Sequence, residues 1–260
     1  MPFCIKCGTK VPENAYFTKK IAIMLVLSCA TIFAQDAFND PRDGKIYKTV
    51  KIGSQVWMAQ NLDYAGEDGY LGLCYGDIPR QKIRKPENCQ KYGRLYNWET
   101  AMKVCPKGWH LPSNAEWDKL LHFVDGAGSK SPYHNSPTID KHLKAVNGWN
   151  DDGNGTDYYG FSESSKSPYH SPTAGKHLKA VNGWNDDGNG TDYYGFSALP
   201  GGHGYSGGGF RNVGYNGDWW SATEYNAGWA SIRLMGYGYS DVLWNTSPRS
   251  YPSSVRCVQD

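Results

Sequence analysis

YGRLYNWETAMKVCPKGWHLPSNAEW, the stretch from Tyr92 to Trp117, contains the clearest local structural signals in the chain. Small and apolar residues recur at helical spacing from Asn97 to Val104. Pro106 and Gly108 follow, and neither residue type continues a helix readily. The pattern therefore predicts one short helix that ends before Pro106.

A second helix is expected to begin at Ser113 within the same stretch. The Ser113 hydroxyl can cap the first turn, and Glu116, three residues later, completes a capping box. The apolar residues that follow recur at helical spacing and should form the buried stripe. They are Trp117, Leu120, Leu121 and Val124.

Strand signals lie on both sides of these helices. Apolar and polar residues alternate around Gly53-Ser54, which predicts an antiparallel hairpin; its apolar members are Ile46, Val50, Ile52, Val56 and Met58. Beyond Phe196, the segments WWSAT (219–223), WASIRLMGYG (229–238) and SVRCVQD (254–260) are expected to be strands. We predict an α+β fold with short antiparallel strands, two short helices and long loops rich in glycine and aromatic residues.

Composition narrows the function classes. The chain has 260 residues with 27 Lys and Arg against 25 Asp and Glu, and it contains no long run of like charges. A nucleic-acid surface or a polybasic membrane patch is therefore not indicated. The 31 Gly, 19 Tyr and 10 Trp favour short strands, tight turns and loops whose rings fill a core or meet sugars.

The N-terminal residues predict export. Lys19-Lys20 precede the apolar segment 21–34, which is shorter than the roughly 20 residues that cross a bilayer. We expect a signal peptide over residues 18–35 with cleavage after Ala34, or alternatively lipoprotein processing at Cys29. Residues 1–17 look like half of a zinc ribbon, because Cys4 and Cys7 supply only two of the four ligands that structural zinc needs. We interpret them as a remnant without metal.

Four cysteines remain after the export signal, and an oxidising environment would pair them. They are Cys74, Cys89, Cys105 and Cys257. Four cysteines permit three pairings, and the residues alone do not choose among them.

Tyr92 to Trp117, together with SVRCVQD, resembles the Fibrobacter succinogenes major paralogous domain. This family of exported bacterial proteins is placed with the C-type-lectin-like and formylglycine-generating-enzyme-like folds, and SNAEW is similar to the LPTEAEWE helix of the latter. The resemblance implies a single domain over residues 36–260. It also implies a disulfide between Cys105 and Cys257, which leaves Cys74 with Cys89.

A tandem duplication occupies residues 129–163 and 164–198. The sequence KHLKAVNGWNDDGNGTDYYGFS occurs at 141–162 and again at 176–197. Two copies are too few for a solenoid. Because the second copy continues into FSALPGG, as related domains do, we assign it to the fold and interpret the first as an insertion. Because the two copies are so similar, one copy can take the place of the other in the fold, or two chains can exchange copies by domain swapping.

Each copy contains NDDGNGTD, which clusters oxygen atoms on glycine-rich turns. Such oxygens suit calcium, but asparagine, aspartate and glycine also form ordinary turns, so both interpretations stay open. The candidate ligands are Asp151, Asp152, Asn154, Thr156 and Asp157 in the first copy, and Asp186, Asp187, Asn189, Thr191 and Asp192 in the second. Calcium is the one cofactor considered.

Neither catalysis nor a lectin-type calcium site is expected from the resemblance. The Trp-Asn-Asp tripeptides at 149–151 and 184–186 lie too early in the chain to match the calcium-dependent lectins. Formylglycine-generating oxidases use a C-terminal cysteine pair, and their relatives use an iron-binding histidine set, but only Cys257 lies near this C-terminus. We expect His110 in GWHLP to be structural.

The remaining candidates are aromatic rings and polar residues near the C-terminus. Flat rings stack on sugars while amides and carboxylates bind hydroxyls. The candidate rings are Tyr205, Tyr215, Tyr225, Trp229, Tyr237, Tyr239 and Trp244, and the polar partners are Asp218, Glu224, Asn226 and Asp241. At least one of Trp219 and Trp220 should be in the core.

These observations favour a non-catalytic, exported binding module at the cell surface or in the extracellular space. The expected partner is a polysaccharide or a cell-surface glycan. The alternatives are a structural or protein-binding envelope component and a relative of the formylglycine-generating enzymes. Nucleic acid is not an expected partner, and no transmembrane helix is expected in the mature chain.

Overall fold

The computed structural model describes residues 36–126 and 171–260. The chain divides into two units, Met1–Gln35 and Asp36–Asp260. The zinc-ribbon remnant (1–17), the signal peptide (18–35) with Cys29, and the first repeat copy (129–163) lie outside the described residues. The second unit contains all of the described residues.

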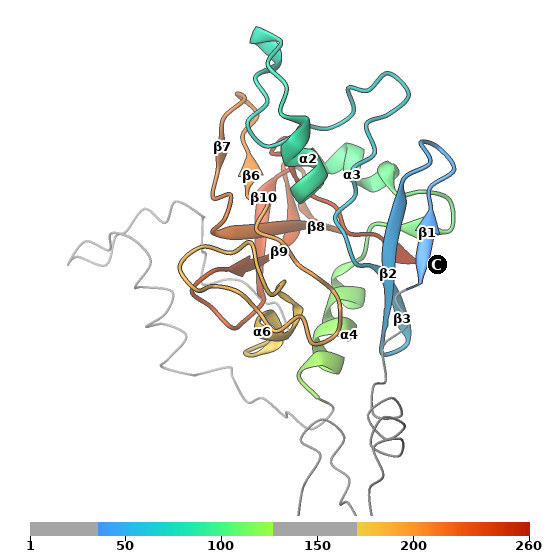
Figure 1. Cartoon of the computed structure of the whole chain (residues 1–260), viewed down its shortest axis with the longest axis vertical. Coiled ribbons are helices and arrows are strands. Elements are labelled where there is room, and N and C mark those ends of the chain that lie inside the picture. Colours follow the sequence, from blue (N-terminus) through green and yellow to red (C-terminus); the bar gives the residue numbers. More distant parts are fainter. Residues whose placement is uncertain (1–35, 127–170) are drawn as a thin grey trace, which may run out of the picture. The chain divides into compact units, whose positions relative to one another are not determined.

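One five-stranded sheet brings the two ends of this unit together (Figure 1). Its strands are, in spatial order, β1 (Ala37–Asn39), β2 (Ile46–Ile52), β3 (Gln55–Met58), β12 (Val258–Gln259) and β5 (Trp109–His110). The expected hairpin is confirmed, with Val50 opposite Trp57 and a turn in which Gly53 has φ of 61°. Val258 pairs with both Trp57 and His110, so the last strand lies between β3 and β5 and joins them in one sheet.

A second five-stranded sheet is formed mostly by the C-terminal half of the chain. Its spatial order is β10 (Leu243–Pro248), β9 (Trp229–Gly236), β8 (Asn216–Asn226), β11 (Ser253–Ser254) and β4 (Leu95–Tyr96). A separate pair is formed by β6 (His203–Gly204) and β7 (Phe210–Arg211). SVRCVQD was expected to be one strand, but it crosses from β11 in this sheet to β12 in the first.

Both expected helices are present. Asn97 caps α3 (Trp98–Val104) by accepting a hydrogen bond from the Thr100 backbone N–H. Ser113 caps α4 (Asn114–Val124), and the capping box with Glu116 is complete. Figure 1 shows α4 between the β2–β3 hairpin and α6, and α4 contacts β2, β8 and α6.

The sequence predicted two helices, but the described residues contain more. The described residues also contain α2 (Pro86–Tyr92), α6 (Ala174–Leu178) and a 3-10 turn at Pro79–Gln81. Helix α2 begins with proline at its first position, which the missing N–H group permits. Helix α6 lies in the second repeat copy and has only five residues.

Large aromatic rings fill the core. Trp57 and Trp117 have ring centroids 4.9 Å apart, and Phe196 lies edge-on to both at 5.9 and 6.1 Å. At least one of Trp219 and Trp220 was expected in the core, and both are fully buried. Since Phe196 belongs to the second repeat copy, that copy contributes directly to the core.

Both disulfides implied by the family resemblance are present. Cys105 pairs with Cys257, which lies 152 residues away, and Cys74 pairs with Cys89. In the chain-entropy model, closing the long loop stabilises the folded state by about 4 to 5 kcal/mol and closing the short loop by about 3. The long-range disulfide joins the end of α3 to the last strands.

Candidate functional site

Three of the candidate rings lie at one edge of the second sheet, and we call Tyr225, Trp229 and Trp244 the edge patch. Trp229 pairs with Pro248, whereas Trp244 pairs with Arg233, four residues further along β9. Side chains an even number of residues apart share a face of a strand, so Trp229 and Trp244 face the same way, with a backbone offset of about 13 Å along the strands. The Tyr225 ring lies 6.0 Å from that of Trp244, edge to face.

These rings are accessible. Tyr225 is 47% exposed and Trp229 is 39% exposed, while Trp244 is partly buried. Thr246 pairs with Ser231, so its hydroxyl lies on the face that Trp229 and Trp244 share. Strand β10 is the outermost strand in the order of its sheet.

Two polar candidates lie on β8 near the edge patch, but Glu224 pairs with Ala230 and therefore faces the side of the sheet opposite to Trp229 and Trp244. The Glu224 carboxylate lies 2.6 Å from the Arg249 guanidinium, which in turn lies 4.3 Å above the Trp98 ring. Glu224 is therefore held in place while its side chain stays 56% exposed. The Asn226 side chain instead holds the β8–β9 turn, because its Oδ1 accepts hydrogen bonds from the backbone N–H groups of Gly228 and Trp229.

The other candidate rings lie elsewhere. Tyr215 and Tyr237 contact each other with ring centroids 5.2 Å apart, and they flank the opposite end of the β8–β9 ribbon. Ten residues of strand separate Tyr215 from Tyr225, or about 33 Å if fully extended. Tyr205 packs against Tyr251 and His203. The rings that the sequence suggested therefore form separate groups.

Asp218 is used inside the protein. It is 2% exposed, and its carboxylate lies 2.6 Å from His203 Nδ1. Burial alone would lower the pKa of His203, but the hydrogen bond and the charge of Asp218 outweigh it and raise the pKa, against the opposing charge of Arg211. This pair joins β6 to β8.

Lys179 was not singled out from the sequence, yet it organises the loop that carries Tyr237 and Tyr239. Its side chain is buried, and its ammonium donates to the backbone carbonyls of Gly236, Tyr237 and Tyr239 at 3.1, 3.3 and 2.9 Å. Burial lowers the pKa of Lys179 to about 8, although the charge of half-buried Asp241 opposes this effect. A lysine in a polar repeat gives no local sign of such burial.

Oxygen atoms in the second NDDGNGTD segment mostly serve the turn itself. Asn189 Oδ1 accepts from the Trp184 backbone N–H, and Asp192 binds the backbone N–H and hydroxyl of Ser197. Thr191 Oγ donates to the Lys176 carbonyl. Within 36–126 and 171–260, no group of three or more His, Cys, Asp or Glu residues could hold a metal ion.

The backbone explains the composition of this segment. Asp186, Asp187 and Asp192 all have positive φ, a conformation that aspartate tolerates better than most residues. The first-copy candidates Asp151, Asp152, Asn154, Thr156 and Asp157 lie outside the described residues.

His110 lies in β5 and hydrogen-bonds two carboxylates. Its Nδ1 lies 2.6 Å from Asp260 and its Nε2 lies 2.7 Å from Glu116, so it links the last strand to the capping box of α4. Burial lowers the pKa of His110, but the hydrogen bonds and charges of the two carboxylates raise it overall. Cys74, Cys89, Cys105 and Cys257 are all in disulfides and are not thiolates.

In the part of the chain that the structure describes, no helix is long and apolar enough to cross a membrane. The two disulfides are compatible with an exported protein. No curated protein matches the chain, and no solved structure does. The model of the Fibrobacter succinogenes major domain matches residues 50–259, which confirms the resemblance seen in the sequence. Because these residues make up well over half of the chain, the protein belongs to the Fibrobacter succinogenes major domain family.

Proposed function

We propose that this protein is an exported, non-catalytic module that binds carbohydrate through the edge patch. One observation carries the proposal: Trp229 and Trp244 share a face of the outer strands, and Tyr225 packs against Trp244. Aromatic faces held on a rigid sheet can stack on sugar rings with little loss of conformational freedom. A backbone offset of about 13 Å along the strands lets the two tryptophans contact different units of one extended polysaccharide.

One polar group on the shared face suits the same ligand class. Thr246 supplies a hydroxyl on the face of the two tryptophans. This geometry favours recognition of a neutral, hydroxyl-rich surface.

We also propose a C-type-lectin-like fold for residues 36–260. Two features support it: the last strand, β12, lies between β3 and β5, and a disulfide joins the end of α3 to Cys257. The proposed site does not include calcium, because Asn189 and Asp192 of the second copy already bind groups of their own turn. We therefore expect carbohydrate binding at the edge patch to persist in a chelator.

The proposal is tested by retention of the purified protein on insoluble plant and bacterial polysaccharides, in calcium and in chelator. Trp229→Ala and Trp244→Ala should each weaken retention. Tyr70→Ala is the matched control, since Tyr70 is 67% exposed and lies outside the patch. Absence of retention on every polysaccharide would rule out the proposed function, and loss only in chelator would restore calcium as a cofactor.

The place of β10 at the end of its sheet, in the order of the described strands, favours a second candidate, a protein-binding envelope component. An outer strand can accept an extended segment of another protein through backbone hydrogen bonds. Capture of an envelope protein that free sugars do not displace, and that Thr246→Pro prevents, would favour this alternative. Displacement by oligosaccharide would favour the edge patch instead.

A further inference from the structure

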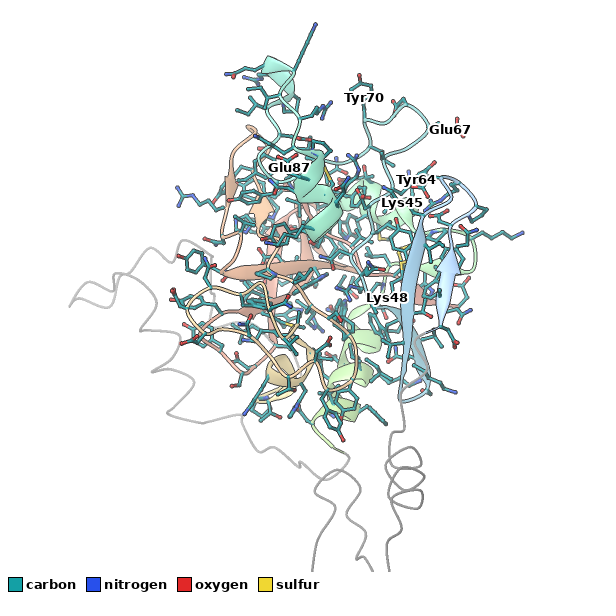
Figure 2. The ribbon with its side chains drawn as sticks, in the orientation of Figure 1. Lys45, Lys48, Tyr64, Glu67, Tyr70 and Glu87 are labelled. Carbon is teal, nitrogen blue, oxygen red and sulfur yellow. A yellow bond between two sulfur atoms is a disulfide. The ribbon has the colours of Figure 1, made fainter. Side chains whose placement is uncertain are left out.

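A cavity of about 320 Å³ lies between the start of β2 and the C-terminal half of α2, far from the edge patch in sequence. Figure 2 shows Lys45 and Lys48 beside β2, on the side toward α2. The other walls come from the segment 59–63, which follows β3, and from residues 197 and 199. The volume is at the lower end of the range for small-molecule sites.

The lining of the cavity is strongly positive. Its charged residues are the cations Lys45, Lys48, Lys91 and Arg256 and a single carboxylate, Asp63.

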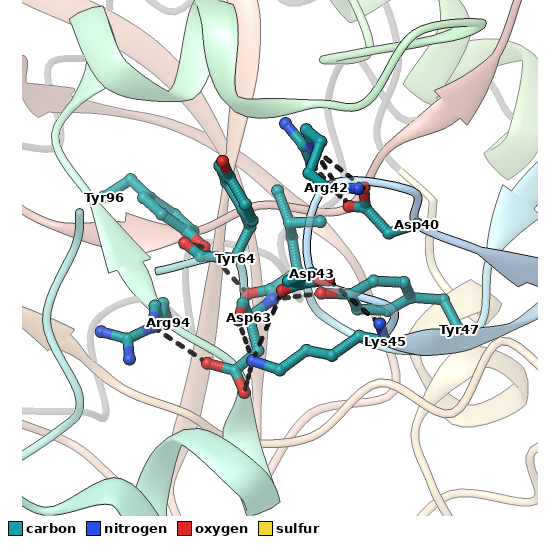
Figure 3. A network of polar contacts seen from close by, with 10 residues as sticks. Asp40, Arg42, Asp43, Lys45, Tyr47, Asp63, Tyr64, Arg94 and Tyr96 are labelled. Atoms are coloured by element: carbon teal, nitrogen blue, oxygen red, sulfur yellow. Dashed lines mark hydrogen bonds and ion pairs between the residues drawn. The ribbon is translucent and has the colours of Figure 1, made fainter. Parts of the chain in front are cut away.

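Asp63 is already shared between two cations. It lies 2.7 Å from Lys45 and 3.1 Å from Arg94, as Figure 3 shows. Among the described residues, Lys48, Lys91 and Arg256 have no ion pair with a carboxylate. The cavity therefore has an excess of positive charge that its own residues do not neutralise.

Among these cations, Arg256 loses the most hydration free energy on folding. It is fully buried, and its guanidinium donates to Asn61 Oδ1 and to the backbone carbonyls of Met58 and Phe196. Burial lowers the pKa of Arg256 to about 9, although the charge of Asp192 opposes this effect. A buried cation with hydrogen bonds but no paired carboxylate is stabilised by an anion nearby.

Neutral hydrogen-bonding groups lie among these charges. Gln60 Oε1 accepts from the Lys48 backbone N–H at 2.9 Å, which leaves the Gln60 amide nitrogen to donate. Gln90 is exposed on α2 and also lines the cavity. Amides of this kind bind hydroxyl groups, and a sugar ring offers several of them.

We propose that this cavity binds a sugar acid of monosaccharide size, with its carboxylate at Lys48 and Lys91 and its hydroxyls at Gln60 and Gln90. The α2 wall is fixed in advance of binding, because Cys89 is tied to Cys74 and the Tyr92 carbonyl accepts from Asn61 Nδ2 at 2.8 Å. A fixed wall reduces the entropy cost of binding. The site is separate from the edge patch and extends the proposed function to a charged ligand.

Isothermal titration of the full protein with glucuronate, glucose and inorganic phosphate tests this proposal. We expect glucuronate to bind at least about tenfold more tightly than the other two, because only it offers both a carboxylate and hydroxyls. The double variant Lys48→Gln/Lys91→Gln should weaken glucuronate binding by about tenfold or more. Lys51→Gln is the matched control, since Lys51 is exposed on β2 but does not line the cavity.

Each other outcome overturns the proposal. Equal binding of glucose would show that the charges do not select the ligand, and equal binding of phosphate would show that the hydroxyls do not. No glucuronate binding, or an unchanged affinity in the double variant, would also contradict it. Trp229→Ala should leave glucuronate binding intact, so failure of the edge patch and failure of this cavity are distinguishable.

Discussion

Asn61 shows how much one side chain can organise in this fold. Its Oδ1 accepts hydrogen bonds from Trp219 Nε1 at 2.8 Å and from Arg256, while its Nδ2 donates to the Tyr92 carbonyl. It therefore joins the segment after β3 to α2, β8 and the C-terminal segment. The sequence could not predict this role, because asparagine is most common in exposed turns.

We expect Asn61→Ala to lower the free energy of unfolding by about 3 to 5 kcal/mol, because it leaves several buried polar groups without partners. Urea denaturation measures this loss. Gln90→Ala, on the exposed surface of α2, is the control and should change the free energy by less than about 0.5 kcal/mol. A loss below about 1 kcal/mol for Asn61→Ala would mean that water or rearrangement replaces the asparagine.

The His203–Asp218 pair should make stability depend on pH. The pKa of His203 is raised in the folded state, so its stabilisation is complete below the unfolded pKa of about 6.5 and is lost as pH rises through the folded pKa. The free energy of unfolding should therefore fall from about pH 6 upward. His110, whose pKa is also raised, adds to the same trend.

Urea denaturation at several pH values from about 5.5 to 8.5 checks this dependence. His203→Gln should flatten the curve in part, because the remaining slope comes from His110. His122→Gln, on the exposed side of α4, should retain the slope of the natural protein. An identical slope in His203→Gln would contradict the assigned role of the pair.

At the scale of elements, the sequence predicted those helices and strands that depend on interactions between residues close together in the chain. The β2–β3 hairpin has alternation around a glycine turn, and both α3 and α4 have capping residues that the structure uses. Strand β10 and the division of SVRCVQD between two sheets were missed. Their positions depend on partners distant in sequence, and β10 has a largely half-buried surface without clear alternation.

The α4 cap allows a test at this scale. Ser113→Ala removes the hydroxyl that accepts from the Glu116 backbone N–H and donates to Glu116 Oε2 at 2.8 Å, while Oε2 keeps its hydrogen bond from the backbone N–H of residue 113. We expect a loss of about 1 kcal/mol in the free energy of unfolding by urea denaturation. Lys119→Ala, on the exposed face of α4, should change it by less than about 0.5 kcal/mol. Equal effects of the two substitutions would show that the cap contributes nothing specific.

At the scale of the whole molecule, the sequence suggested candidate residues but could not show which of them lie together in the fold. Tyr215 and Tyr225 are only ten positions apart, yet an extended strand places them at opposite ends of the β8–β9 ribbon. The cations of the cavity come from β2, α2 and the C-terminal segment, and no local spacing links them. Conversely, the buried positions of Lys179 and Arg256 depend on backbone carbonyls that only the folded chain brings together.

The central claim is that the edge patch binds carbohydrate. The most direct test compares two double variants by depletion binding to the polysaccharide that best retains the natural protein. Trp229→Ala/Trp244→Ala removes the two tryptophans of the shared face, whereas Tyr215→Ala/Tyr237→Ala removes an exposed ring pair at the opposite end of the ribbon. We predict that the first variant loses at least about tenfold in affinity, since each stacked ring contributes about 1 kcal/mol or more, and that the second is unchanged. Loss in the second variant alone, or equal loss in both, would contradict the assignment.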